Sequence, residues 1–213
     1  MSGVIDRLTA ARIVPVVEIS DPARGVELAR TLAAAGLPTM EVTLRTPEAL
    51  DAIRAISEEI PGFLVGAGTL LTVRQLDDAV AAGAHFGVSP GFTAGLSAAA
   101  RAADLPFVPG AVSASEILAA ADGGHTHVKF FPAEQSGGAA AIASLAAPFA
   151  ALQIRFMPTG GIRPGNLDAY LAIPSVFAIG GTWIAPRASI AEGRFDEIGK
   201  AAREAVATVG ALA

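Results

Sequence analysis

The stretch Phe63-Leu64-Val65-Gly66-Ala67-Gly68 is apolar on both of its faces, which is typical of a strand in a parallel sheet covered on both sides. Seven other runs along the chain are similarly rich in Val, Ile and Phe. They are Ile13–Ile19, Thr39–Leu44, His85–Ser89, Pro106–Gly110, His127–Phe131, Ile154–Pro158 and Val176–Gly180. Between the runs lie Ala- and Glu-rich segments, such as Val26–Ala33 and Leu76–Val80, whose apolar residues recur at helical spacing. The sequence therefore predicts eight strands, each followed by a helix.

Eight strand–helix units in a chain of 213 residues close most economically into a (β/α)8 TIM barrel, an α/β fold. An open doubly wound sheet is the competing architecture, but its Gly-x-Gly-x-x-Gly fingerprint does not follow Ile19. No linker or shift in composition indicates a second domain, so residues 1–213 are expected to form a single barrel domain. Within residues 1–12, the segment 4–12 predicts an extra helix that caps the N-terminal end of the barrel.

Turn residues indicate where several of these helices begin and end. Asp21-Pro22 and Thr46-Pro47 each place a capping residue before a proline at the first helical position. Gly36 and Gly83 stand where helices are expected to stop.

Composition excludes several functional classes. With 52% hydrophobic and 16% charged residues the chain can bury a large core, and a net charge of -5 argues against nonspecific nucleic-acid or anionic-membrane binding. The absence of cysteine excludes disulfides, thiolate metal sites and a cysteine nucleophile. No apolar stretch reaches the roughly 20 residues that span a bilayer, and the N-terminus has no signal-peptide pattern. A cytoplasmic protein is expected.

One of only two lysines, Lys129, lies inside the predicted buried strand His127–Phe131. Burying its charge without a partner would cost several kcal/mol, so desolvation is expected to lower the pKa and leave a neutral amine. A neutral amine attacks carbonyl carbon, which makes Lys129 a candidate Schiff-base lysine. Phe131 lies on the same face and would help to exclude water. The alternative is that Lys129 ends its strand and extends its ammonium group to solvent.

Other polar residues also fall at strand ends, where barrel active sites lie. Alternation places Glu41, Thr43 and Arg45 on one face, so a buried carboxylate and an arginine at the rim are expected. The alternative is a purely structural Glu41–Arg45 ion pair. Glycines in Gly66–Thr69 and Ser89–Gly91 would let a ligand approach the backbone, or would simply make tight turns.

Paired glycines are expected to form turns after the last two strands, in Thr159-Gly160-Gly161 and Gly180-Gly181-Thr182. Barrels commonly bind phosphate on backbone N–H groups at these two places, so the pairs predict a phosphate site. A structural role for both turns is the alternative. The three histidines lack metal-ligand spacing, so neither a metal nor a cofactor is expected.

Together these motifs resemble the class I family of 2-keto-3-deoxy-6-phosphogluconate (KDPG) and 4-hydroxy-2-oxoglutarate (KHG) aldolases. The resemblance spans nearly the whole chain. Its motifs are Glu41-Val42-Thr43-Leu44-Arg45-Thr46, Gly66-Ala67-Gly68-Thr69, Ser89-Pro90-Gly91, Val128-Lys129-Phe130-Phe131-Pro132-Ala133-Glu134, Pro158-Thr159-Gly160-Gly161-Ile162 and Gly180-Gly181-Thr182-Trp183. It implies a lyase of the Entner-Doudoroff pathway, usually a homotrimer, which cleaves KDPG to pyruvate and glyceraldehyde 3-phosphate.

The resemblance also implies roles for individual residues. Lys129 would form the Schiff base and Glu41 would be the general acid/base. The remaining implied roles are carboxylate binding by Arg45 and Thr69, pocket lining by Pro90 and Phe131, and phosphate binding by Gly160, Gly161, Gly181 and Thr182, beside Thr159 and Gly180 of the same turns. The chain departs from the family in having Val128 for Phe, Met157 for Cys and Thr182 for Ser. The first two are expected off or behind the reacting face, whereas the extra methyl of Thr182 bears on phosphate affinity.

Two other functions remain open from the sequence. One is an aldolase for KHG or for the galactonate epimer of KDPG, which would share the lysine and the glutamate. The other is a phosphate-binding barrel without Schiff-base chemistry, such as a sugar-phosphate isomerase, in which Lys129 contacts an anion. In each case the partner is a small molecule.

Overall fold

The computed structural model describes residues 2–211, and eight parallel strands form its centre. The strands are β1 (Ile13–Val17), β2 (Thr39–Thr43), β3 (Leu64–Gly68), β4 (Phe86–Val88), β5 (Phe107–Val108), β6 (His127–Phe130), β7 (Arg155–Pro158) and β8 (Ile179–Gly181). All eight predicted strands are confirmed. The largest shift is in β8, which begins three residues later than the run Val176–Gly180 and ends one residue beyond it.

The strands close into a ring in which neighbouring strands pair in parallel. Six strands form the sheet β5-β4-β3-β2-β1-β8, and β6 pairs with β7. Single bridges join these two groups, from Gly110 to Lys129 and from Thr159 to Gly180. The predicted (β/α)8 barrel is therefore confirmed, and the alternative of an open doubly wound sheet is excluded.

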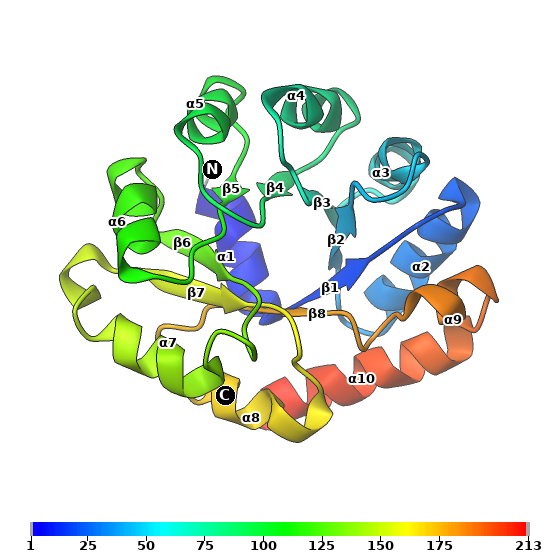
Figure 1. Ribbon diagram of the computed structural model, residues 1–213. Coiled ribbons are helices and arrows are strands. Elements are labelled where there is room, and N and C mark those ends of the chain that lie inside the picture. The colour runs from blue at the N-terminus through cyan, green and yellow to red at the C-terminus, as the bar shows by residue number, and fades with distance from the viewer. Residues whose placement is uncertain (1, 212–213) are drawn as a thin grey trace.

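Helices surround the strands, as Figure 1 shows. The helices of the described residues are α1 (Ser2–Ala11), α2 (Pro22–Ala34), α3 (Ala49–Glu59), α4 (Val73–Ala81), α5 (Ala94–Ala102), α6 (Ala114–Asp122), α7 (Gly138–Ala146), α8 (Leu167–Leu171), α9 (Arg187–Ala191) and α10 (Phe195–Ala211), with short 3-10 helices η1 (Ala150–Leu152) and η2 (Pro164–Asn166). Capping chemistry sets several starts: Thr72 and Ser113 each form a capping box at the first turn of α4 and α6.

The predicted helix boundaries are partly correct. Asp21 caps α2 by accepting a hydrogen bond from the Ala23 N–H at 2.9 Å, and Gly36 follows the helix with a φ of +89°. Thr46-Pro47 does not begin α3, which starts at Ala49 without a side-chain cap. The Thr46 hydroxyl instead donates to the Ile19 carbonyl, and so ties the loop after β2 to the end of the first predicted strand.

Two apolar layers hold the barrel together. The larger layer lies between the outward faces of the strands and the surrounding helices, and includes Val42, Val65 and Val128. The smaller layer fills the barrel near its N-terminal end with Val14, Leu64, Phe86, Val88, Val108, Met157 and Phe177. Fully buried side chains of this size each stabilise the fold by about 1.5–3 kcal/mol relative to exposure.

The N-terminal helix α1 completes the smaller layer. Leu8 of α1 is fully buried among these barrel residues, and Val4 and Ile5 pack against the same cluster. Figure 1 shows α1 inside the ring of outer helices. The helix thus packs at the N-terminal end of the barrel and leaves the opposite end for the candidate site. No helix within residues 2–211 is both long and apolar enough to cross a membrane.

Candidate active site

Two oppositely charged side chains meet inside the barrel near its C-terminal end. Lys129 comes from β6 and Glu41 from β2, and Lys129 Nζ lies 3.0 Å from Glu41 Oε1 and 3.3 Å from Oε2. Lys129 is 6% exposed and Glu41 is completely buried. Burying two charges is costly, and it is tolerated here because each partner satisfies the other at hydrogen-bonding distance.

This pair excludes two of the alternatives that the sequence left open. Lys129 does not extend to solvent, because its ammonium group is turned inward onto the carboxylate of Glu41. Glu41 does not pair with Arg45 either, since Arg45 Nη1 is bonded to Glu18 Oε1 at 3.1 Å. Alternation correctly placed Glu41 on the inward face of its strand. It could not reveal a partner 88 residues away.

The glycines of β3 make room for this arrangement. A Cβ on Gly68 would lie 2.1 Å from Glu41 Oε1, and a Cβ on Gly66 would lie 2.3 Å from the ring of Phe86. Both distances are far below a normal van der Waals contact. The two glycines therefore make room for neighbouring side chains of the protein itself.

A cavity of about 190 Å³ opens beside the lysine. Its lining residues are Val16, Thr43, Arg45, Thr69, Pro90, Lys129, Phe131, Thr159, Gly160 and Thr182. Lys129 Nζ lies 5.4 Å from the centre of the Phe131 ring, so an aromatic wall stands against the amine. The cavity thus has an aromatic ring beside the lysine and a cation, Arg45, elsewhere on its wall.

Thr69 adopts an unusual backbone conformation at the edge of this cavity. Its φ is +60°, in the left-handed region that β-branched residues rarely adopt. Such a conformation costs on the order of 1–3 kcal/mol and persists where the surrounding structure imposes it. Thr69 thus stands in a strained backbone position on the cavity wall.

The two predicted phosphate turns differ in structure. Gly160 and Gly161 follow β7 with φ values of +100° and +77°, so they form a true glycine turn. Gly180 and Gly181 instead lie within β8 and pair with Val14 and Pro15 of β1. The expectation of a second glycine turn is wrong. A Cβ on Gly180 would lie 2.1 Å from a side-chain atom of Thr159, and a Cβ on Gly181 would lie 2.1 Å from a side-chain atom of Trp183.

The structure therefore brings most, but not all, of the predicted site residues together. Eight of the twelve line the cavity, and a ninth, Glu41, contacts the lining residue Lys129. Gly161, Gly180 and Gly181 do not line it. Sequence reasoning missed Val16 and Thr43 as lining residues. Thr43 shares the Glu41 face of the strand, a signal that was visible, and its hydroxyl donates to the Val17 carbonyl at 3.0 Å.

A second acidic side chain supports the loop after β6. Tyr170 of α8 is buried and donates a hydrogen bond from its hydroxyl to Glu134 Oε1. Burial and this neighbouring carboxylate both raise the pKa of the Tyr170 hydroxyl above its usual value. The backbone N–H of Glu134 also donates to the Gly160 carbonyl at 3.2 Å. The loop carrying Phe131 is thereby joined to the glycine turn after β7.

The histidines lie away from the cavity in polar or aromatic contacts. His125 Nε2 is 2.8 Å from the Ser97 hydroxyl, and burial, aided by Arg101, lowers the pKa of the ring. His127 packs edge-on to Phe177, and burial with nearby Arg155 lowers its pKa as well. Within residues 2–211, no group of three or more His, Cys, Asp or Glu side chains could hold a metal ion.

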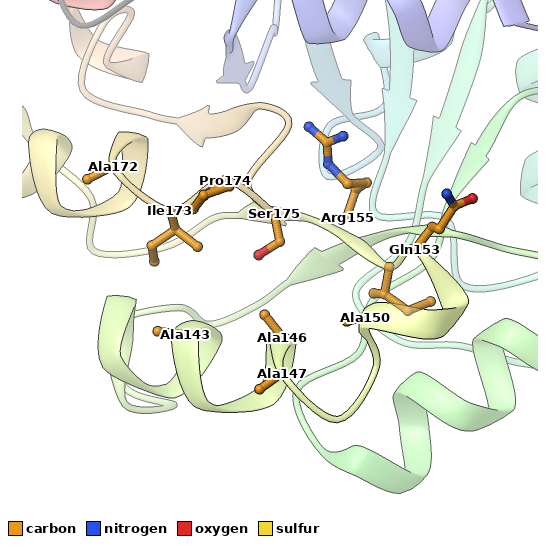
Figure 2. Close-up of a pocket in the computed structure, with 11 residues that line it drawn as sticks. Ala143, Ala146, Ala147, Ala150, Gln153, Arg155, Ala172, Ile173, Pro174 and Ser175 are labelled. Carbon is orange, nitrogen blue, oxygen red and sulfur yellow. The ribbon is translucent and has the colours of Figure 1, made fainter.

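A larger cavity of about 620 Å³ lies on the outside of the barrel, between α7 and the segment that follows α8. Figure 2 shows it lined by alanines of α7 and by Ile173, Pro174 and Ser175, with the Arg155 side chain turned away from the alanines. No carboxylate and no lysine lies among its lining residues. Size alone would favour this cavity, but the buried Lys129–Glu41 pair lies at the smaller one.

Fold and site together define a (β/α)8 barrel protein with a buried lysine–carboxylate pair at the catalytic end of its strands. The family model described as "KDPG and KHG aldolase" matches residues 4–201. An Escherichia coli K12 relative called KHG/KDPG aldolase is 46% identical over 199 residues, covering 93% of this chain and 92% of that protein. A 2-dehydro-3-deoxy-phosphogluconate aldolase of Treponema pallidum is 44% identical over the full length of both chains.

A solved structure agrees with these sequence relatives. The KDPG aldolase of Legionella pneumophila, with pyruvate captured at low pH as a covalent carbinolamine intermediate, superposes with a TM-score of 0.90. It is 37% identical, and the match covers 94% of this chain and 96% of that one. This chain belongs to the KDPG and KHG aldolase family, and it is accordingly a carbon–carbon lyase.

Proposed function

We propose that this protein is a class I aldolase that cleaves KDPG to pyruvate and glyceraldehyde 3-phosphate through an imine on Lys129. The observation that carries the proposal is the buried contact of Lys129 Nζ with Glu41 at 3.0 and 3.3 Å beside the cavity. An amine needs to lose a proton before it can attack a ketone, and a carboxylate at this distance can accept that proton.

The first half of the reaction forms the imine. One proton passes from Lys129 Nζ to Glu41, and the neutral amine attacks C2 of the keto acid to give a carbinolamine. Protonation of the carbinolamine hydroxyl by the Glu41 carboxylic acid releases water and leaves a protonated imine. The imine cation then withdraws electrons from the neighbouring C3–C4 bond.

The second half breaks the carbon–carbon bond. Glu41, again a carboxylate, removes the proton of the C4 hydroxyl, through a water molecule, as the C3–C4 bond breaks. The electrons of the C3–C4 bond pass into the imine, and the products are glyceraldehyde 3-phosphate and an enamine of pyruvate. Glu41 returns the proton to C3, and hydrolysis of the new imine releases pyruvate and restores Lys129. The apolar wall of Phe131 limits water around the amine during these steps.

The two ends of the substrate carry negative charge, and the cavity offers a donor group for each end. Arg45 and Thr69 are proposed to bind the pyruvyl carboxylate, because a guanidinium group donates two hydrogen bonds to a carboxylate in one plane. Pro90 lines the pocket with them. At the other end, Thr159, Gly160 and Thr182 are proposed to bind the phosphate. Gly161, Gly180 and Gly181 would act through their backbone or by making room for Thr159 and Trp183.

The test is covalent trapping. The protein is incubated with pyruvate and sodium borohydride, then digested and analysed by peptide mass spectrometry. We expect a reduced pyruvyl adduct on Lys129. The other lysine, Lys200, is exposed on α10 and serves as the internal control for nonspecific reaction. No adduct in folded protein, or an adduct on both lysines alike, would contradict the proposal and favour a phosphate-binding barrel without Schiff-base chemistry.

A second substrate is favoured by one observation. The Escherichia coli relative carries both activities in its name, KHG/KDPG aldolase, so cleavage of 4-hydroxy-2-oxoglutarate by this chain is the alternative. That substrate lacks a phosphate and would rely little on Thr182 and the glycine turn. Comparing kcat/KM for KDPG, its galactonate epimer and 4-hydroxy-2-oxoglutarate decides between them. A preference for the unphosphorylated compound would replace KDPG as the main substrate.

We further propose that the protein acts in the Entner-Doudoroff pathway in the cytoplasm, as a homotrimer of single-domain chains. The resemblance to the family supports these assignments. Sedimentation equilibrium measures the mass of the assembly directly, and a monomer or dimer would contradict the trimer.

A further inference from the structure

Three charged side chains form a chain of contacts across the rim of the small cavity. Glu18 follows β1, and its two carboxylate oxygens bind different arginines. Oε1 accepts from Arg45 Nη1 at 3.1 Å, and Oε2 accepts from Arg187 Nη1 at 3.2 Å. We call Arg45, Glu18 and Arg187 the rim triad.

The triad links three neighbouring loops. Strand β1 lies between β8 and β2 in the barrel. Glu18 follows β1, Arg187 follows β8 and Arg45 follows β2. Glu18 is therefore placed between the loop that carries Arg45 and the loop that runs from Thr182 to Arg187. Both of these loops contribute a lining residue to the cavity, Arg45 and Thr182.

The contact with Glu18 occupies only one edge of the Arg45 guanidinium group. Within residues 2–211, Glu18 is its sole hydrogen-bond partner, through Nη1. A guanidinium group has five N–H donors in one rigid plane, so fixing one nitrogen orients the rest. The Arg45 side chain is 51% exposed, and without this contact it would sample many rotamers.

Resting on the proposed function, we propose that Glu18 is a positioning residue for carboxylate binding in this aldolase. It holds Arg45 by Nη1 and leaves the remaining donors turned to the cavity for the carboxylate of the keto acid. Arg187 is the second member of the arrangement. It binds the other oxygen of Glu18 and keeps that carboxylate in the plane that Arg45 requires.

A competing role predicts the opposite result. If Glu18 competed with the substrate carboxylate for Arg45, removing its charge would tighten binding. If Glu18 orients Arg45, removing it weakens binding. Because all three side chains are partly exposed, their replacement removes little packing, and the variants are expected to fold.

The experiment compares Glu18→Gln, Arg187→Gln and the double variant with wild type. The readout is the pyruvate concentration that gives half-maximal adduct formation on Lys129 with borohydride. Pyruvate has the carboxylate but no phosphate, so it reports the Arg45 end alone. We expect this concentration to rise about two- to five-fold in Glu18→Gln, the effect of losing one partly exposed charged hydrogen bond. The adduct yield at saturating pyruvate is expected to stay unchanged.

The double variant tests the order of the contacts. Arg187→Gln acts through Glu18, so its effect is expected to be smaller and to vanish when Glu18 is already Gln. With KDPG, Glu18→Gln is expected to raise KM and leave kcat near wild type. The matched control is Glu59→Gln, which removes the charge of an exposed glutamate of α3 that is paired with Arg30 of α2 and does not line the cavity. Its pyruvate dependence is expected to equal that of wild type.

The outcomes separate the two proposals. No adduct in wild type overturns the proposed function, and the role of Glu18 falls with it. A wild-type adduct with an unchanged or lower half-maximal pyruvate concentration in Glu18→Gln overturns the positioning role alone. Independent, additive effects of Glu18→Gln and Arg187→Gln would overturn the assignment of Arg187 as a support for Glu18.

Discussion

Two ion pairs of this protein have the same length and opposite surroundings. Lys129–Glu41 and Arg30–Glu59 are each 3.0 Å apart, but the side chains of the first pair are 7% and 0% exposed and those of the second are 60% and 51% exposed. In water such a pair contributes about 0–1 kcal/mol, because solvent screens it. In the barrel the same attraction opposes a desolvation penalty of several kcal/mol per ion. The distance within an ion pair therefore does not distinguish a buried candidate catalytic pair from a solvent-exposed surface pair, whereas the burial of its side chains does.

The buried pair is broken most completely by Lys129→Met, which keeps the length of the side chain and removes the amine. We expect no pyruvyl adduct after borohydride and no measurable cleavage of KDPG, because the nucleophile is lost. Intact mass and a coupled assay for pyruvate measure the two effects. Lys200→Met is the matched control and should behave as wild type, since Lys200 is 75% exposed on α10. An adduct retained in Lys129→Met would remove this residue from the mechanism.

Glu41→Gln keeps the shape of the buried pair and removes its ability to exchange a proton. We expect the imine with pyruvate still to form, but more slowly because Glu41 no longer takes and returns its protons, and we expect turnover to fall about 10²–10⁴-fold, the usual contribution of a positioned acid/base. Borohydride trapping and steady-state kinetics measure the two separately. Turnover equal to that of wild type would show that another group moves the proton.

The space around Glu41 is tested by Gly68→Ala. The new Cβ would lie 2.1 Å from Glu41 Oε1, so the carboxylate is expected to shift away from Lys129. Overpacking of this kind costs about 1–3 kcal/mol, and we expect a fall in turnover of about 10-fold or more. Urea unfolding and kinetics check both. Gly165→Ala is the control, because no atom lies within 4 Å of a Cβ there. Equal behaviour of the two variants would contradict the role given to Gly68.

Breaking the exposed Arg30–Glu59 pair is expected to have the smallest effect on stability and activity. Glu59→Gln leaves Arg30 in water, where its charge needs no partner. We expect the free energy of unfolding to change by less than about 1 kcal/mol and kcat/KM to stay at the wild-type value. A loss comparable to that of the buried variants would erase the distinction between the two environments.

The sequence predicted the barrel well because the signal is local. Each strand is a short apolar run, and each helix has its own apolar spacing, so eight units could be counted without knowing any contact. The errors occurred where tertiary contacts outweigh local pattern. Thr46-Pro47 has the form of a helix start, but the Thr46 hydroxyl bonds to the Ile19 carbonyl and α3 begins at Ala49.

The same difference between local sequence pattern and tertiary contacts explains which features of the candidate site could be predicted. Alternation along β2 predicted that Glu41 points inward, and the location of Lys129 in a strand predicted that it is buried; both are confirmed. Neither pattern contains the distance between them, since they are 88 residues apart. Glycine was the most ambiguous residue: the turn at Gly160 was predictable, but Gly180 serves to admit the Thr159 side chain, which only the folded chain reveals.

The distribution of the two lysines has a practical consequence for conjugation. Lys200 carries the one ε-amine that solvent reaches freely, whereas the amine of Lys129 lies inside the barrel, bonded to Glu41. Among side-chain amines, reagents such as N-hydroxysuccinimide esters should therefore label α10 almost exclusively. Attachment through Lys200 would tether the protein to a support by α10 and leave the cavity beside Lys129 unmodified.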